Sequence, residues 1–155
     1  MRVVSNTSPL VYLILIQEIQ ILPELFSAVS IPLAVRDELA HPDAPIQVRE
    51  WIRLPPGWLS VVPVPPQRED AELQRLDPGE REAILLAEQL DPGLLLLDDR
   101  KARQVARQRE LLLTGLIGVL RMAIGRDLVD AVTVVARLKA TTFRASDVLL
   151  EMLLR

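Results

Sequence analysis

The sequence predicts an α/β fold, a three-layer α/β/α sandwich in which helices cover both faces of a parallel sheet. Five short, mostly apolar runs have the composition of strands buried on both faces; they lie at 2–5, 29–31, 59–62, 94–97 and 111–113. Helical segments separate these runs, and strands that alternate with helices form right-handed βαβ units. The 155 residues are close to the length of one domain, so we expect a single domain over 1–155.

Turn and cap residues set the expected element boundaries in the first half of the chain. The strand at 2–5 stops at Asn6, Ser8 can cap the next helix, and Pro9 suits its first turn. Prolines after residue 40 and residue 54 break two later helices, and the cluster Pro63–Pro66 ends the third strand. The helices expected in this half are 10–16, 19–26, 33–40 and 46–53.

The second half has a clearer helix start. Asp77-Pro78-Gly79-Glu80 combines a cap residue, proline at the first helical position and a carboxylate where a capping box needs one. This helix is expected to reach Leu90 and to end at Asp91-Pro92-Gly93. The later helices are expected at 100–110, 116–124, 128–140 and 146–154.

Composition excludes several classes of protein. Half of the residues are hydrophobic (50%), which argues against a disordered chain. The net charge of −3, from 18 Lys and Arg against 21 Asp and Glu, is unlike a protein that coats DNA, so nucleic acid would need a local basic patch. The chain has no cysteine, which excludes disulfides, zinc–thiolate sites and thiol nucleophiles and fits a cytoplasmic location.

No membrane or targeting segment is expected. The apolar run Leu10–Ile16 is far shorter than the roughly 20 residues that span a bilayer. Ser5 to Pro9 interrupts the apolar start that a signal peptide requires.

Polar residues follow two of the predicted strands. Asn6 follows the first strand, and Asp98-Asp99 follow the fourth. The carboxyl ends of parallel strands share one edge of the sheet, which is where such folds place their sites. Adjacent carboxylates repel each other, and a divalent cation would balance them. The alternative is that one of the two acids caps the helix that begins near Arg100.

Two glutamates are candidates on helices. Glu38 falls on the apolar side of its helix, where an unpaired carboxylate is costly, unless it reaches water at the boundary. Glu82 lies at the border of an apolar face, and as a single residue it is also consistent with a solvated position. Glu80 is best explained as the capping-box partner.

The other chemical motifs are weak. His41 is the only histidine and precedes a proline, which gives no support to a Ser–His–Asp triad. No glycine pattern matches a phosphate-binding loop. A basic cluster beyond the acidic pair is either a solvated helix face or a contact for RNA phosphates; its members are Arg100, Lys101, Arg103, Arg107 and Arg109.

Taken in chain order, these features resemble the PIN-domain family, which includes the VapC-type toxin ribonucleases of toxin–antitoxin pairs. The opening Val3–Leu10 is similar to the family's first motif, a strand that ends in an acid followed by Thr or Ser. Glu38, Glu82 and Asp99 match the second, third and fourth acidic positions, and Asp99 fits the fourth better than Asp98. The runs 79–84, 94–103 and 114–120 are similar to a PIN-like branch of prokaryotic proteins.

The resemblance implies a five-stranded parallel sheet and a site for Mg²⁺ or Mn²⁺ that hydrolyses RNA phosphodiester bonds. The catalytic residues it implies are Glu38, Glu82 and Asp99. The metal ligands it implies are Asn6, Glu38, Glu82, Asp98 and Asp99, with Thr7 and Ser8 orienting Asn6. Arg100, Lys101 and Arg103 are the expected RNA contacts. One departure is Asn6, an amide where the family has an acid.

The expected function is therefore a metal-dependent ribonuclease, with RNA as substrate and a small antitoxin protein as partner. The alternative that Asn6 favours is a PIN-like module that binds RNA or a protein without cleaving. A receiver-like signalling domain would need its acidic pair after the first strand, where this chain has Asn6. The apolar helices near the C-terminus predict a homodimer, or a partner helix on that surface.

Overall fold

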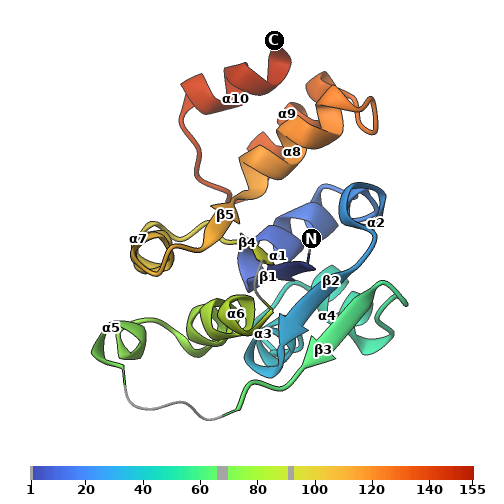
Figure 1. Cartoon of the computed structure of the whole chain (residues 1–155). Helices are drawn as coiled ribbons and strands as arrows, with labels where there is room; N and C mark the ends of the chain where they lie inside the picture. The colour runs from blue at the N-terminus through green and yellow to red at the C-terminus, as the bar shows by residue number, and fades with distance from the viewer. Residues whose placement is uncertain (1, 66–69, 91–92) are drawn as a thin grey trace.

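A five-stranded parallel sheet forms the centre of the molecule. The computed structural model describes residues 2–65, 70–90 and 93–155. Its strands are β1 (Arg2–Ser5), β2 (Val29–Pro32), β3 (Leu59–Val62), β4 (Gly93–Leu96) and β5 (Leu112–Thr114). They lie side by side in the order β3-β2-β1-β4-β5, and every pair is parallel (Figure 1). The predicted fold class is confirmed.

Consecutive side chains of β1 enter two separate cores. Val3 packs with Leu94 and Leu96 on one face of the sheet, and Val4 packs with Leu95 and Leu97 on the other. Because successive residues of a strand point to opposite faces, a sheet with two apolar faces needs two helical layers. Fully burying one such leucine contributes roughly 1.5–3 kcal/mol.

The helices divide between these two layers. The first core includes side chains from α1 (Thr7–Leu15), α2 (Ile21–Phe26), α3 (Leu33–Leu39), α4 (Ile46–Arg53), α8 (Leu116–Gly125), α9 (Ala131–Lys139) and α10 (Asp147–Leu154). The second core is covered by α5 (Ala71–Gln74), α6 (Pro78–Gln89) and α7 (Arg100–Gln108). In Figure 1, α8, α9 and α10 extend beyond the β5 end of the sheet.

Several boundaries differ from the sequence-based expectation. Helix α1 begins at Thr7, so Asn6 and not Ser8 is its N-cap residue. Helix α9 begins at Ala131 because the side chain of Asp130 accepts a hydrogen bond from the Thr133 N–H and caps it there. The short helix α5, which Asp70 caps, was not expected.

The proline-containing boundaries are only partly described. The predicted helix end at 91–92 and the last residue of the cluster 63–66 lie outside the described residues. Gly93, which was expected to end a helix, is the first residue of β4.

The chain order creates a crevice at the centre of the sheet. From β1 the chain passes to β2 on one side, whereas β4 pairs with β1 on the other side. Ligands of open α/β sheets bind where the strand order reverses in this way, beyond the carboxyl ends of the strands. The Asn6 N–H extends this edge by donating to the Leu96 carbonyl at 2.9 Å.

No helix within the described ranges is both long and apolar enough to cross a bilayer.

Candidate metal centre

A cavity of about 540 Å³ opens at the carboxyl ends of β1 and β4. Its polar lining is Asn6, Thr7, Ser8, Glu38, Asp77, Glu80, Asp98, Asp99, Thr142 and Arg144. Val11, Tyr12 and Phe143 complete the wall. The rings of Tyr12 and Phe143 meet edge to face, with centroids 5.1 Å apart. The cavity is therefore acidic, with an aromatic pair on its wall.

Four buried oxygens in this lining have no hydrogen-bond partner among the described residues: Asn6 Oδ1, Thr7 Oγ1, Glu38 Oε2 and Asp98 Oδ2. A buried polar atom left unpaired costs about 1–3 kcal/mol, so such atoms are rare and usually meet a ligand, an ion or water. Four oxygens at one cavity form a donor set that suits a hard divalent cation.

Asn6 has the backbone of a helix N-cap residue, yet its side-chain oxygen is unpaired. It adopts the extended conformation (φ −79°, ψ 176°) of a helix N-cap residue, but its side chain caps nothing in α1. An N-cap asparagine usually accepts a hydrogen bond from the N–H two or three residues later. Here the side chain is only 5% exposed and Oδ1 stays unpaired.

Glu38 reaches from α3 to the start of α6. Its carboxylate occupies the space beside Gly79, where any added Cβ would collide with it. Burial raises the pKa of Glu38, and the carboxylates of Asp77 and Glu82 raise it further, while the Thr7 hydroxyl and the Gly79 N–H lower it. The Thr7 hydroxyl lies near Glu38 without making a hydrogen bond of good geometry. A nearby cation would favour the charged form.

Asp98 has the same arrangement at the start of α8. Its Oδ1 accepts a hydrogen bond from the Leu116 N–H at 2.8 Å and lies against Gly115, while its Oδ2 is unpaired. Burial raises the pKa of Asp98, and the Leu116 N–H, the Arg103 guanidinium and the Ser8 hydroxyl lower it. Each of the two carboxylates thus lies at a helix N-terminus, where the helix dipole favours negative charge.

Asp98 and Asp99 have different roles. The sequence left open which of them caps the following helix and which faces a metal. Asp99 accepts a hydrogen bond from the Ala102 N–H at 2.9 Å and caps α7, although it also lines the cavity. Asp98 has the unpaired oxygen. The geometry therefore favours Asp98 as the metal-facing member, whereas the motif match favoured Asp99.

Glu82 and Glu80 are placed differently from expectation. Glu82 is not among the cavity-lining residues; its Oε1 accepts a hydrogen bond from the Ala34 N–H at 3.2 Å, close to Glu38. Glu80 lines the cavity and is only 9% exposed. It also forms the predicted capping box with Asp77, whose N–H donates to Glu80 Oε1 at 3.4 Å.

The environment of Glu80 is strongly acidic. Burial, then the carboxylates of Asp77 and Asp99, raise the pKa of Glu80 to about 7. From the sequence, Glu80 was expected only to cap α6, because that role already explains a carboxylate at the third helical position. Its place in the cavity depends on α6 meeting α3, which no local pattern reveals.

The donor set fits an oxygen-binding cation but is poor in charge. Within the described ranges, no three side chains of His, Asp or Glu are close enough together to hold a metal. The best donors are the carboxylates of Glu38 and Asp98, with the neutral oxygens of Asn6 and Thr7. Such ligands suit Mg²⁺ and Mn²⁺ and not soft metals.

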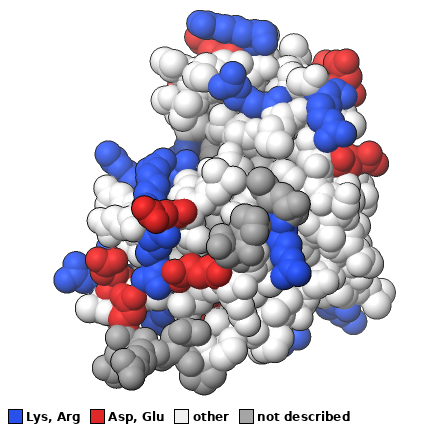
Figure 2. Space-filling view, viewed as in Figure 1, with Lys and Arg blue, Asp and Glu red and all other residues white. Residues whose placement is uncertain are grey.

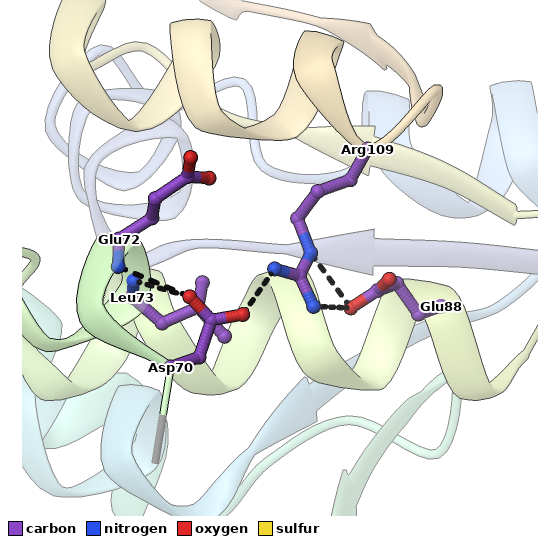
Figure 3. Close-up of polar contacts among 5 residues, drawn as sticks. All are labelled: Asp70, Glu72, Leu73, Glu88 and Arg109. Carbon is purple, nitrogen blue, oxygen red and sulfur yellow. Dashed lines mark hydrogen bonds and ion pairs between the residues drawn. The ribbon is translucent and has the colours of Figure 1, made fainter. Parts of the chain in front are cut away.

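The basic cluster of α7 does not act as one surface. Arg100 and Lys101 are exposed and lie outside the cavity lining. Arg103 donates to the Leu97 carbonyl at 2.7 Å, beside Asp98. Arg109 pairs with Asp70 at 2.7 Å and Glu88 at 2.8 Å, and thereby links α5, α6 and the end of α7 (Figure 3). Figure 2 shows basic and acidic side chains interspersed on the α7 side of the molecule.

Comparison with known proteins gives one kind of match. A family model described as a PIN domain matches residues 2–155. No curated protein and no solved structure was found to match the chain.

Proposed function

The chain belongs to the PIN-domain family, and on that premise we propose that it is a metal-dependent ribonuclease that hydrolyses RNA phosphodiester bonds. The family premise supports a nuclease-type fold with a divalent metal. The observation that carries the proposal is the set of four unpaired buried oxygens at one cavity, beyond the ends of β1 and β4.

In this proposal the oxygens of Asn6, Glu38 and Asp98 hold Mg²⁺ or Mn²⁺. Asp99, which lines the cavity, adds negative charge. Glu82 does not line the cavity but adds negative charge beside Glu38. The hydroxyl of Thr7 near Glu38 and that of Ser8 near Asp98 would orient these carboxylates once a cation is bound. When bound, such a cation activates water and neutralises the charge that develops on a phosphate.

The protein's own contribution is positioning. The N-termini of α6 and α8 fix Glu38 and Asp98 before any ligand arrives, so these carboxylates need little reorganisation.

Cleavage of single-stranded RNA tests the proposal. Cutting should require Mg²⁺ or Mn²⁺, and Glu38→Ala and Asp98→Ala should each abolish it. The matched control is Glu24→Ala on α2, outside the cavity lining, which should cut like the unmodified protein. Cutting that persists in both cavity variants would identify a contaminating nuclease and refute the assignment.

A second function is favoured by one specific residue. Asn6 removes a negative charge from the donor set, so a module that binds RNA or a protein without cleaving is the alternative. Binding of RNA with no cleavage in either metal would support that alternative.

The toxin role is a further part of the proposal and rests on the resemblance to VapC-type toxins. Induced expression should arrest growth in a bacterial host, and Glu38→Ala should relieve the arrest. A small antitoxin encoded beside this chain should protect the host. Normal growth at high expression of an active ribonuclease would contradict the toxin role.

A further inference from the structure

A second hollow of about 430 Å³ lies beside the candidate metal centre. Asp98, Phe143 and Arg144 line both spaces, so the two are continuous at these residues. The rest of its wall comes from α7, β5, α8 and α10, and includes Arg103, Thr114, Arg121 and Met152. We call this hollow the arginine groove.

Three guanidinium groups face the arginine groove from separate parts of the fold. Arg103 comes from α7, Arg121 from α8 and Arg144 from the segment between α9 and α10. Arg121 and Arg144 are exposed. Among the described residues, none of the three makes an ion pair with a carboxylate. Arg109, by contrast, is held by Asp70 and Glu88 (Figure 3).

Arg103 already donates to the Leu97 carbonyl beside Asp98, whereas the exposed Arg121 and Arg144 stay hydrated unless an anion joins them. The one carboxylate that lines this groove is Asp98, whose Oδ1 already accepts the Leu116 N–H. The positive charge of the groove therefore adjoins the negative charge of the metal cavity. This pairing suits a ligand whose anionic groups repeat along a chain, with one of them entering the cavity.

We propose that the arginine groove binds the backbone of single-stranded RNA next to the phosphate that enters the metal cavity. Arg121 and Arg144 contact phosphates, as arginine does in most nucleic-acid complexes. Phe143, half-buried at the junction, offers an aromatic surface to an unpaired base, which a duplex could not present. The inference rests on the proposed function for its substrate class.

An acidic peptide is the competing occupant, because Ile117, Leu149 and Met152 give the groove an apolar wall. RNA is favoured because Phe143 lies where the groove joins the cavity, and its ring can stack on a base, which an acidic side chain does not offer. A strand held by the arginines would also carry a phosphate into the proposed metal site.

Binding in EDTA tests the inference apart from catalysis, since cutting then cannot occur. The probe is a short fluorescein-labelled oligouridylate, followed by fluorescence anisotropy over a range of salt concentrations. Arg121→Ala and Arg144→Ala should each weaken binding, and each should reduce the slope of log K against log salt by about 0.7. Arg144→Lys should restore most of the slope, because it restores the charge.

The matched control is Arg126→Ala, an exposed residue at the end of α8 outside the groove lining. It should bind like the unmodified protein. Affinity and salt slope unchanged in the Arg121→Ala, Arg144→Ala double variant would overturn the inference, even if the protein proves to be a ribonuclease. Loss of binding in that variant, with no cleavage in any metal, would support the inference and refute the proposed function. Displacement of RNA by polyglutamate at lower concentration than by unlabelled RNA would overturn RNA as the occupant.

Discussion

Asn6 makes the donor set of the metal cavity one negative charge poorer than an acid at this position would. Its amide keeps one oxygen donor but contributes no negative charge. Two unit charges about 4 Å apart interact by roughly 1–4 kcal/mol under partial screening. Desolvation of a carboxylate takes back part of this energy. Asn6→Asp should therefore tighten Mn²⁺ binding by about one to two decades.

Calorimetric titration of Mn²⁺ into both proteins measures this change. Asn6→Ala, which removes the oxygen as well, should bind more weakly than the unmodified protein. Unchanged or weaker affinity in the aspartate variant would exclude Asn6 from the metal site.

Glu80 predicts a pH dependence of stability. Its pKa, about 7 in the folded state, lies above the ordinary glutamate value of 4.5. A carboxyl group with a raised folded pKa stabilises the fold while it is protonated, and this contribution is lost as pH rises from about 4.5 to 7. Glu80→Gln can keep the capping box, which accepts Glu or Gln, and carries no charge.

Melting temperatures in EDTA test the role of Glu80. The melting temperature of Glu80→Gln should rise relative to that of the unmodified protein as the pH increases from 4.5 to 7. Glu50→Gln, on α4 outside the cavity lining, serves as control and should show no such trend. A difference that stays constant over this range would contradict the raised pKa.

At the scale of elements, two helix starts hold the half-buried carboxylates of Glu38 and Asp98. Gly79 in α6 leaves room for Glu38, and Gly115 before α8 leaves room for Asp98. In Gly79→Ala and Gly115→Ala the new methyl group displaces the carboxylate. Each variant should therefore lose at least about tenfold in Mn²⁺ affinity, equal to ~1.4 kcal/mol.

Gly125→Ala provides the matched control. Gly125 is the last residue of α8, and a Cβ there would meet nothing within 4 Å. Alanine should stabilise this position by about 0.5–1 kcal/mol and leave Mn²⁺ binding unchanged. Equal Mn²⁺ affinity in all three variants would show that the helix starts do not position the ligands.

Most elements could be predicted from the sequence because their signals are local. Apolar runs mark the strands, and the Asp77–Glu80 capping box marks α6. Helix α5 was missed because four residues after a proline-rich stretch give no periodic pattern. The N-cap of α1 was placed at Ser8 because serine is a common cap, whereas the chain turns at Asn6, directly after β1.

Part of the lining of the candidate site could be expected from the sequence. Asn6 and Asp98 were singled out because parallel strands bring their carboxyl ends together, and Glu38 because a carboxylate on an apolar face is anomalous. Arg121, Phe143 and Arg144 were not singled out. They reach the cavity or its groove only through the packing of α8 and the segment before α10 against the β5 side of the sheet.

At the scale of the whole molecule, the last two helices leave an apolar surface. Helix packing buries Val134, Leu138 and Leu153, which accounts for part of the apolar excess in the sequence. Val132 on α9 remains 69% exposed, and Val148 on α10 remains 67% exposed. A contiguous exposed apolar patch is typical of an interface, and we propose that Val132 and Val148 belong to such a patch and that it pairs two copies of the chain.

Sedimentation velocity tests the dimer. The unmodified protein should sediment as a dimer, and the Val132→Lys, Val148→Lys double variant should sediment as a monomer. Leu54→Lys, at a residue that is 88% exposed before β3, should leave the dimer intact. A monomer at high concentration for the unmodified protein would disprove self-association, and a partner helix would then be the remaining occupant.

Asn6, Glu38 and Asp98 are proposed to form one divalent-metal site. A crystal soaked in Mn²⁺, with anomalous scattering recorded at the manganese edge, can locate the ion. One strong peak is expected within coordinating distance of Glu38 and Asp98, next to the Asn6 amide oxygen, and it should be lost in Asp98→Asn. A fully soaked crystal with no peak in this cavity, or with manganese held by other residues, would contradict the proposal.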